Sequence, residues 1–86
     1  MKIEELLDHF INKFENIFVE DATTGYNACW SQVDAAGDID EDWEETEERI
    51  AADLDEFLKD YDDYEVVNWE CENSEMNELW VMVKKK

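Results

Sequence analysis

The segment from Gly37 to Glu48 carries the densest group of side chains that could bind a cation or a cationic partner. Eight of the eleven residues after the glycine are acidic: Asp38, Asp40, Glu41, Asp42, Glu44, Glu45, Glu47 and Glu48. Grouped carboxylates can ligate a divalent metal, act as a proton donor and acceptor pair, or attract the basic groups of another protein. The spacing of the acids helps to decide among these kinds of chemistry.

The acidic segment does not have the spacing of an EF-hand calcium loop. Such a loop needs oxygen ligands at positions 1, 3 and 5, glycine at position 6 and a bidentate glutamate at position 12. Counted from Asp38, acids fill the first three ligand positions, but Trp43 stands at position 6 and Arg49 at position 12. We therefore expect no dedicated metal site, and at most weak, non-specific binding of divalent cations.

No combination of residues in the chain has the pattern of a catalytic site. The single histidine, His9, has no nucleophile placed to meet it, and Cys29 and Cys71 do not supply the closely spaced ligands of a zinc or iron–sulfur site. Ser31 and Ser74 lie in none of the nucleophile motifs, and the two glycines cannot build a phosphate-binding loop. We expect no enzyme activity and no cofactor, and we expect both thiols to be reduced and buried.

The overall charge restricts the class of partner. The 86 residues include 26 acids and 7 basic residues, which gives a formal net charge of −19. Hydrophobic residues still make up 44%, with four Trp, four Phe and three Tyr, so the whole chain, 1–86, should fold as a single acidic domain. Phosphates would be repelled, which argues against direct binding to nucleic acid or to an anionic membrane and favours a basic protein as partner. No apolar run is long enough for a membrane span and the first residues lack the features of a signal peptide, so the expected location is the cytoplasm of a host cell.

Apolar spacing predicts the elements that position these acids. Residues 3–19 have apolar side chains at helical spacing and predict an amphipathic helix, and residues 26–33 predict a short strand. A second helix should begin near Asp38 or Asp40, with Asp38 and Glu41 as a capping pair. Its predicted buried stripe consists of Trp43, Ile50, Leu54, Phe57, Leu58 and Tyr61.

The C-terminal part of the chain predicts a hairpin. Residues 64–72 and 79–84 alternate between apolar and polar side chains, and the segment between them is polar, so the two should pair as antiparallel strands. The predicted fold is therefore α+β, with a three-stranded antiparallel sheet and two helices on one face, in the order α-β-α-β-β.

The second predicted helix would turn most of its acids outward. Helical residues three or four apart are neighbours at about 5–6 Å between Cβ atoms, so these acids form a row. The phosphates of one DNA strand occur once per ~3.4 Å of axial rise, and the Lys and Arg of a protein groove cannot distinguish carboxylate from phosphate by charge alone. The expected partner-binding residues are Asp38, Asp40, Glu41, Asp42, Glu44, Glu45, Glu48, Asp55 and Asp62.

In size, charge and lack of a catalytic motif, the chain resembles the acidic DNA-mimic inhibitors encoded by phages and mobile elements. Anti-CRISPR proteins, anti-restriction proteins and uracil-DNA glycosylase inhibitors are of this kind. The resemblance covers the whole chain in composition and includes no shared motif, so it assigns no individual residue. It implies a protein that occupies the nucleic-acid-binding groove of a nuclease or of a CRISPR or restriction effector and blocks it sterically.

Two other interpretations remain open at this stage. An immunity protein or antitoxin would also cover a basic surface, but the surface of one cognate toxin, and its binding would depend on specific aromatic anchors as much as on charge. Trp69 or Trp80, both on predicted strands, could supply an exposed anchor, although aromatic residues in strands usually belong to the core. A solvated acidic domain, or one that binds divalent cations weakly, would need no protein partner.

Overall fold

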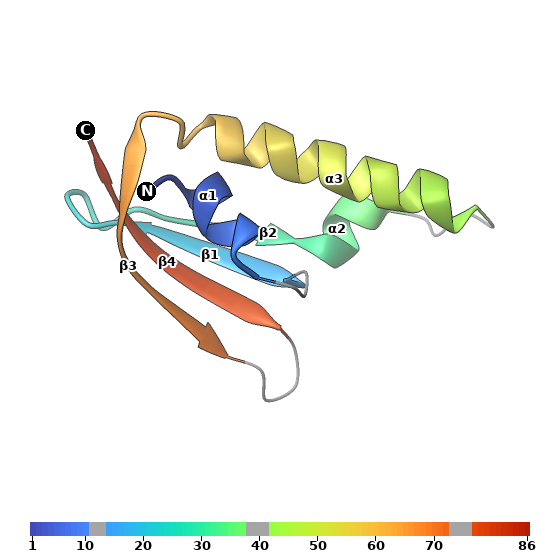
Figure 1. The fold of residues 1–86 in the computed structure, drawn as a ribbon, viewed down its shortest axis with the longest axis horizontal. Coiled ribbons are helices and arrows are strands. Elements are labelled where there is room, and N and C mark those ends of the chain that lie inside the picture. The colour runs from blue at the N-terminus through green and yellow to red at the C-terminus, as the bar shows by residue number, and fades with distance from the viewer. Residues whose placement is uncertain (11–13, 38–41, 73–76) are drawn as a thin grey trace.

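The computed structural model describes residues 1–10, 14–37, 42–72 and 77–86, which form a sheet with helices packed on one side (Figure 1). In chain order the elements are α1 (Ile3–Asp8), β1 (Asn16–Asp21), β2 (Asn27–Ser31), α2 (Gln32–Ala36), α3 (Trp43–Lys59), β3 (Tyr64–Glu72) and β4 (Glu78–Lys85). The order is therefore α-β-β-α-α-β-β.

Within the described residues the sheet is mixed and has four strands in the order β2-β1-β4-β3. β1 pairs antiparallel with β2 and parallel with β4, and β3 pairs antiparallel with β4. The predicted three-stranded antiparallel sheet with two helices is thus wrong in strand number, pairing and element order. The α+β class and the antiparallel pairing of the last two strands are as predicted.

The main error concerns the first predicted helix. α1 ends at Asp8, and residues 16–21 form β1, one of the two central strands of the sheet. Ile17 and Val19 point into the core, each 1% exposed, and pair with Leu79 and Val81 of β4. An apolar cluster such as Ile17-Phe18-Val19 fits both a helical stripe and a strand, and β-branched residues pack well in the centre of a sheet. The long-range pairing decides between the two.

The second difference lies after β2. The predicted strand over residues 26–33 is shorter, because Gln32 begins the short helix α2. Gly37 ends this helix with φ 61° and ψ −135°, a backbone conformation that residues with a Cβ rarely adopt. Residues 34–37 therefore form the end of a helix and its glycine cap.

The core lies between the sheet and the layer of α1 and α3 (Figure 1). β4 contributes Leu79, Val81 and Val83, and α1 contributes Ile3 and Leu6. These five side chains are at most 2% exposed. The opposite face of the sheet has no helix over it in the described structure (Figure 1).

α3 largely follows its predicted pattern. Ile50 and Leu58 are buried, and Leu54, Phe57 and Tyr61 are partly buried against the core. The helix begins at Trp43, whereas the predicted start near Asp38 or Asp40 and the predicted Asp38–Glu41 capping pair lie outside the described residues. Trp43 belongs to the predicted stripe but is 54% exposed, because the N-terminal end of α3 extends past the sheet (Figure 1).

Tyr61, just after α3, gives the fold a pH dependence at alkaline pH. Its ring contacts Phe57 and Tyr64 at centroid distances of 5.5 and 5.4 Å. Burial, and then nearby groups such as Tyr26 and Asp60, raise the pKa of Tyr61 above its ordinary 10.0. Folding therefore favours the protonated phenol, so its contribution to stability is complete below about pH 10 and is lost as the pH rises through the raised folded pKa.

We predict that Tyr61→Phe, which keeps the ring contacts, loses less unfolding free energy than the wild type between about pH 9 and about pH 11. Urea unfolding followed by circular dichroism at each pH measures the difference. Parallel stability curves for the two proteins would show that this phenol does not titrate differently in the folded and unfolded states.

Candidate partner-binding surface

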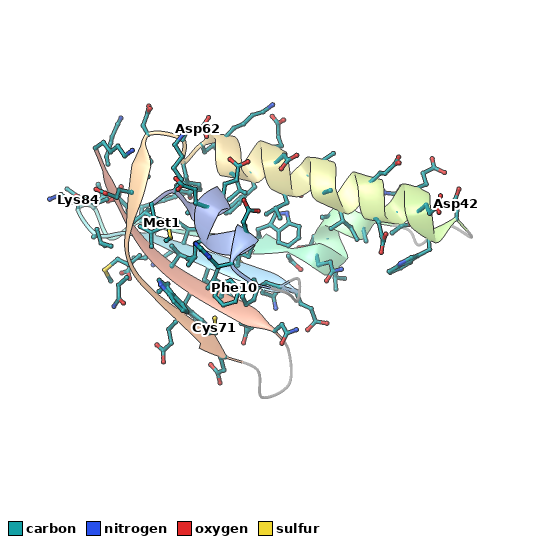
Figure 2. All side chains as sticks on the ribbon, viewed as in Figure 1. Met1, Phe10, Asp42, Asp62, Cys71 and Lys84 are labelled. Carbon is teal, nitrogen blue, oxygen red and sulfur yellow. The ribbon has the colours of Figure 1, made fainter. Side chains whose placement is uncertain are left out.

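The outer side of α3 is an acidic surface made by the period of the helix. Glu44, Glu48 and Asp55 are exposed and lie within roughly 40° of one another around the axis, at about 100° per residue. Glu45 is exposed on the flank of this row, and Asp62 continues the acidic surface beyond the C-terminal end of the helix. Figure 2 shows carboxylates along the outer side of α3, with Asp42 and Asp62 at its two ends.

The density of acids on α3 resembles that of phosphates on one DNA strand. Between Trp43 and Lys59 the helix has seven acids, Glu44, Glu45, Glu47, Glu48, Asp53, Asp55 and Glu56, and two basic residues, Arg49 and Lys59. A helix of 17 residues is about 25 Å long, which gives about one acid per 3.6 Å of axis. A DNA strand has one phosphate per ~3.4 Å. Lys59 pairs with Glu56 at 3.2 Å, an exposed contact that neutralises only the C-terminal end of this surface.

The structure brings six of the nine predicted binding residues into one region. Asp38, Asp40 and Glu41 lie outside the described residues. The other six are all exposed and lie on α3 or at its ends: Asp42, Glu44, Glu45, Glu48, Asp55 and Asp62. The helical period predicts the outward position of the four acids within α3, whereas Asp42 and Asp62 flank the helix.

Asp42 caps α3 as well as contributing charge. Its Oδ1 accepts hydrogen bonds from the backbone N–H groups of Glu44 at 3.1 Å and Glu45 at 3.4 Å. Such a cap satisfies N–H groups that have no partner within the helix, and a negative charge suits the positive end of the helix dipole.

We predict that Asp42→Ala lowers the unfolding free energy by about 1 kcal/mol, because the capping acceptor is lost. Asp42→Asn should lose less, since the amide oxygen still accepts from the same N–H groups, while it removes one charge from the acidic surface. Chemical denaturation of the two variants measures this difference. Equal losses would mean that charge, and not capping, determines the role of Asp42 in stability.

Trp43 is an exposed aromatic side chain beside the acids. Its Nε1–H donates a hydrogen bond of 2.9 Å to Oε1 of Glu47, one helical turn away. This contact gives the indole a preferred position at the N-terminal end of α3. Periodicity assigned Trp43 to the core and so missed its exposure, because a sequence pattern does not show where the sheet beneath a helix ends.

Asp53 has a structural partner that the sequence did not indicate. Nε1 of the buried Trp30 donates a hydrogen bond of 2.9 Å to Oδ2 of Asp53, which links β2 to α3. This pair is 23 residues apart in the chain. Of the seven acids on α3, Asp53 therefore contributes to the internal structure as well as to the surface charge.

The cysteines differ in part from their expected state. Cys29 and Cys71 are free thiols, but Cys29 is exposed rather than buried. The slight desolvation of the thiol within this exposed residue, followed by the charges of Asp34 and Glu78, raises the pKa of Cys29 above its ordinary 9.0. The thiol is thus protonated at neutral pH, which is the opposite of what a nucleophilic cysteine needs.

Two further features are absent from the described part of the chain. No three of its His, Cys, Asp and Glu side chains are arranged to hold a metal ion. None of its helices is both long enough and apolar enough to cross a membrane. Comparisons of the chain with protein families, with curated proteins and with solved structures found no match.

Proposed function

We propose that the protein is an inhibitor that binds the nucleic-acid-binding groove of a basic protein, with α3 in the place of a DNA strand. The observation that supports this most strongly is the exposed acidic surface of α3, a helix whose acids, counted around all its sides, occur along the axis about as densely as phosphates along one DNA strand. The partner is a nuclease or a CRISPR or restriction effector, and inhibition is steric.

The charge of the whole chain would assist the encounter. A net charge of −19 creates a long-range field that attracts a basic groove and raises the association rate, most strongly at low ionic strength. A small soluble domain usually needs only about 2–8 net charges. A binding function of this kind would use the excess charge. Without such a function the excess would only lower the stability of the folded state, because like charges repel.

Trp43 would supply a contact that charge alone does not. It lies at the N-terminal end of α3, is hydrogen-bonded to Glu47 and is 54% exposed. Indole side chains are frequent among the residues that dominate binding energy at interfaces. The end of α3 that extends beyond the sheet would therefore offer a groove two different sides, Glu44 and Glu48 on the outer side and Trp43 with Glu47 on the side that faces the sheet further along the helix.

A pull-down from host lysate tests the proposal. The tagged protein is immobilised, and capture is compared at low and high salt, with and without excess duplex DNA. We expect basic DNA-binding proteins in the eluate. Duplex DNA should displace them from the immobilised protein, and high salt should weaken their binding to it. Capture that duplex DNA does not reduce would contradict the DNA-mimic mechanism, as would an eluate without basic proteins.

An immunity protein or antitoxin is the second candidate, and the exposed indoles favour it. Trp43, Trp69 and Trp80 are each about half exposed, at 54%, 47% and 47%. Such anchors suit one cognate toxin with a matching surface. In the same pull-down this function predicts a single partner that resists both high salt and duplex DNA. A domain acidic only for solvation predicts no specific partner at any salt concentration.

A further inference from the structure

The open face of the sheet has a groove that α3 does not contribute to. A cavity of about 250 Å³ lies on it, lined mainly by β1, β3 and β4. Its side chains include an aromatic pair, two carboxylates and two amides: Phe18, Trp80, Glu20, Glu70, Asn27 and Asn68. Helices cover the other face of the sheet and leave this one open in the described structure (Figure 1).

Strand register arranges this groove in two rows across the sheet. In the first row Phe18 of β1 pairs with Trp80 of β4, and Trp80 pairs with Glu70 of β3. In the second row, two residues further along each of β1 and β4, Met82 of β4 stands between Glu20 of β1 and Asn68 of β3. Directly paired side chains lie about 5 Å apart at their Cβ atoms, so the carboxylates border the aromatic pair.

The aromatic pair is partly exposed on the open face of the sheet. The rings of Phe18 and Trp80 are stacked, with centroids 4.2 Å apart and planes 18° from parallel. Trp80 is still 47% exposed, and Phe18 is partly exposed beside it. Large aromatic side chains that remain accessible on an open sheet face commonly mark a binding surface.

We propose that this groove binds an arginine side chain of an extended, basic protein segment. A guanidinium group is planar and cationic, stacks on an indole face and donates hydrogen bonds to carboxylates. Trp80 would supply the stacking face, and Glu70 and Glu20 would accept from the N–H groups of the guanidinium. The guanidinium would stack on the indole face that Phe18 leaves uncovered, and the Arg methylene groups would lie on Met82.

The charges of the groove select this occupant over the alternatives. Among the described residues that line the groove, two are acidic and none is basic. A phosphate or another anionic ligand would be repelled. A second copy of the chain would bring its own Glu20 and Glu70 against the same residues, and each copy carries a net charge of −19. This inference does not depend on the function proposed for α3, because the two surfaces lie on opposite sides of the sheet.

Titration of the ¹⁵N-labelled protein with two short peptides tests the assignment. The probes are acetyl-Gly-Gly-Arg-Gly-Gly-amide and the same peptide with Lys in place of Arg. We expect the indole N–H signal of Trp80 to shift with the Arg peptide and that of Trp43 to stay in place. The Arg peptide should bind at least about threefold more tightly than the Lys peptide, because guanidinium, unlike ammonium, both stacks on an aromatic face and forms bidentate hydrogen bonds to a carboxylate.

Variants of equal charge separate groove binding from general attraction. Glu20→Gln with Glu70→Gln removes two charges from the groove, and Glu45→Gln with Glu48→Gln removes two from α3. We expect the groove variant to lower the affinity for the Arg peptide by about fivefold or more and the α3 variant to change this affinity less than twofold. Trp80→Thr, which places another good strand former at this position, should lower the affinity for the Arg peptide by about fivefold.

Several outcomes would overturn the inference. These are equal affinities for the two peptides, equal losses in the two double variants, or a Trp80 signal that does not move. Self-association that strengthens with salt and shifts the Trp80 signal would assign the groove to a second copy instead. Because the peptides are tested on the isolated protein, a failed pull-down with α3 leaves this result intact, and a failed peptide titration leaves the pull-down intact.

Discussion

Replacing Ile17 with alanine is expected to lower the unfolding free energy by about 2–5 kcal/mol. Ile17 is 1% exposed in the central strand β1 and pairs with Trp30 on one side and Leu79 on the other. The truncation loses buried apolar surface and leaves a cavity where neighbouring strands hold the backbone in place. A domain of this size has a total stability of only about 4–13 kcal/mol, so the loss is a large part of it.

Val19→Ala tests the same strand, and Val33→Ala is the matched control at an exposed position. Val19 is 1% exposed in β1, whereas Val33 is 69% exposed in α2. We expect Val19→Ala to cost about 1.5–3 kcal/mol and Val33→Ala to change stability by less than about 0.5 kcal/mol. Denaturant unfolding of the three variants measures these values. Similar small effects for Val19 and Val33 would contradict a central strand at residues 16–21.

Reversing two charges on α3 is expected to weaken partner binding by about thirtyfold at low salt. Glu44 and Glu48 lie one turn apart on the exposed row, and both would become Lys. Each exposed charge contact contributes up to about 1 kcal/mol, and reversal replaces attraction with repulsion. The affinity is measured by calorimetry with the partner that the pull-down identifies.

The control for this variant has the same charge change and the same helical spacing. Glu4 and Asp8 are exposed and also stand four residues apart, but on α1. Reversing both should reduce affinity by less than about threefold, because only the long-range part of the attraction changes. If the α3 and α1 variants lose equal affinity for the partner, net charge and not the position on α3 determines binding.

The sequence predicted those parts of the fold that local pattern determines. The hairpin of β3 and β4 follows from alternation on both sides of a polar segment, and α3 follows from its period. β1 could not be predicted in this way, because its apolar residues fit a helix as well, and only the parallel pairing with β4 resolves the ambiguity. Parallel pairing joins segments about 60 residues apart and leaves no local signal.

The two candidate surfaces differ in the same respect. The exposed acids of α3 follow directly from the helical period, and their predicted outward position agrees with their exposure. The groove on the sheet could not be predicted, because Phe18 was assigned to the buried stripe of a helix. In β1 its position between the inward-facing Ile17 and Val19 turns it to the opposite face, where it meets Trp80. Strand register creates this pair.

The measurement that we would make first once a partner is identified is a competition with DNA. The purified partner is bound to a fluorescently labelled duplex, and the protein is added while anisotropy is recorded. We expect full release of the labelled duplex. The apparent affinity of the protein for its partner should weaken in proportion to added unlabelled DNA and should fall steeply with salt. A complex in which the partner holds both the duplex and the protein would contradict the mimicry of DNA by α3.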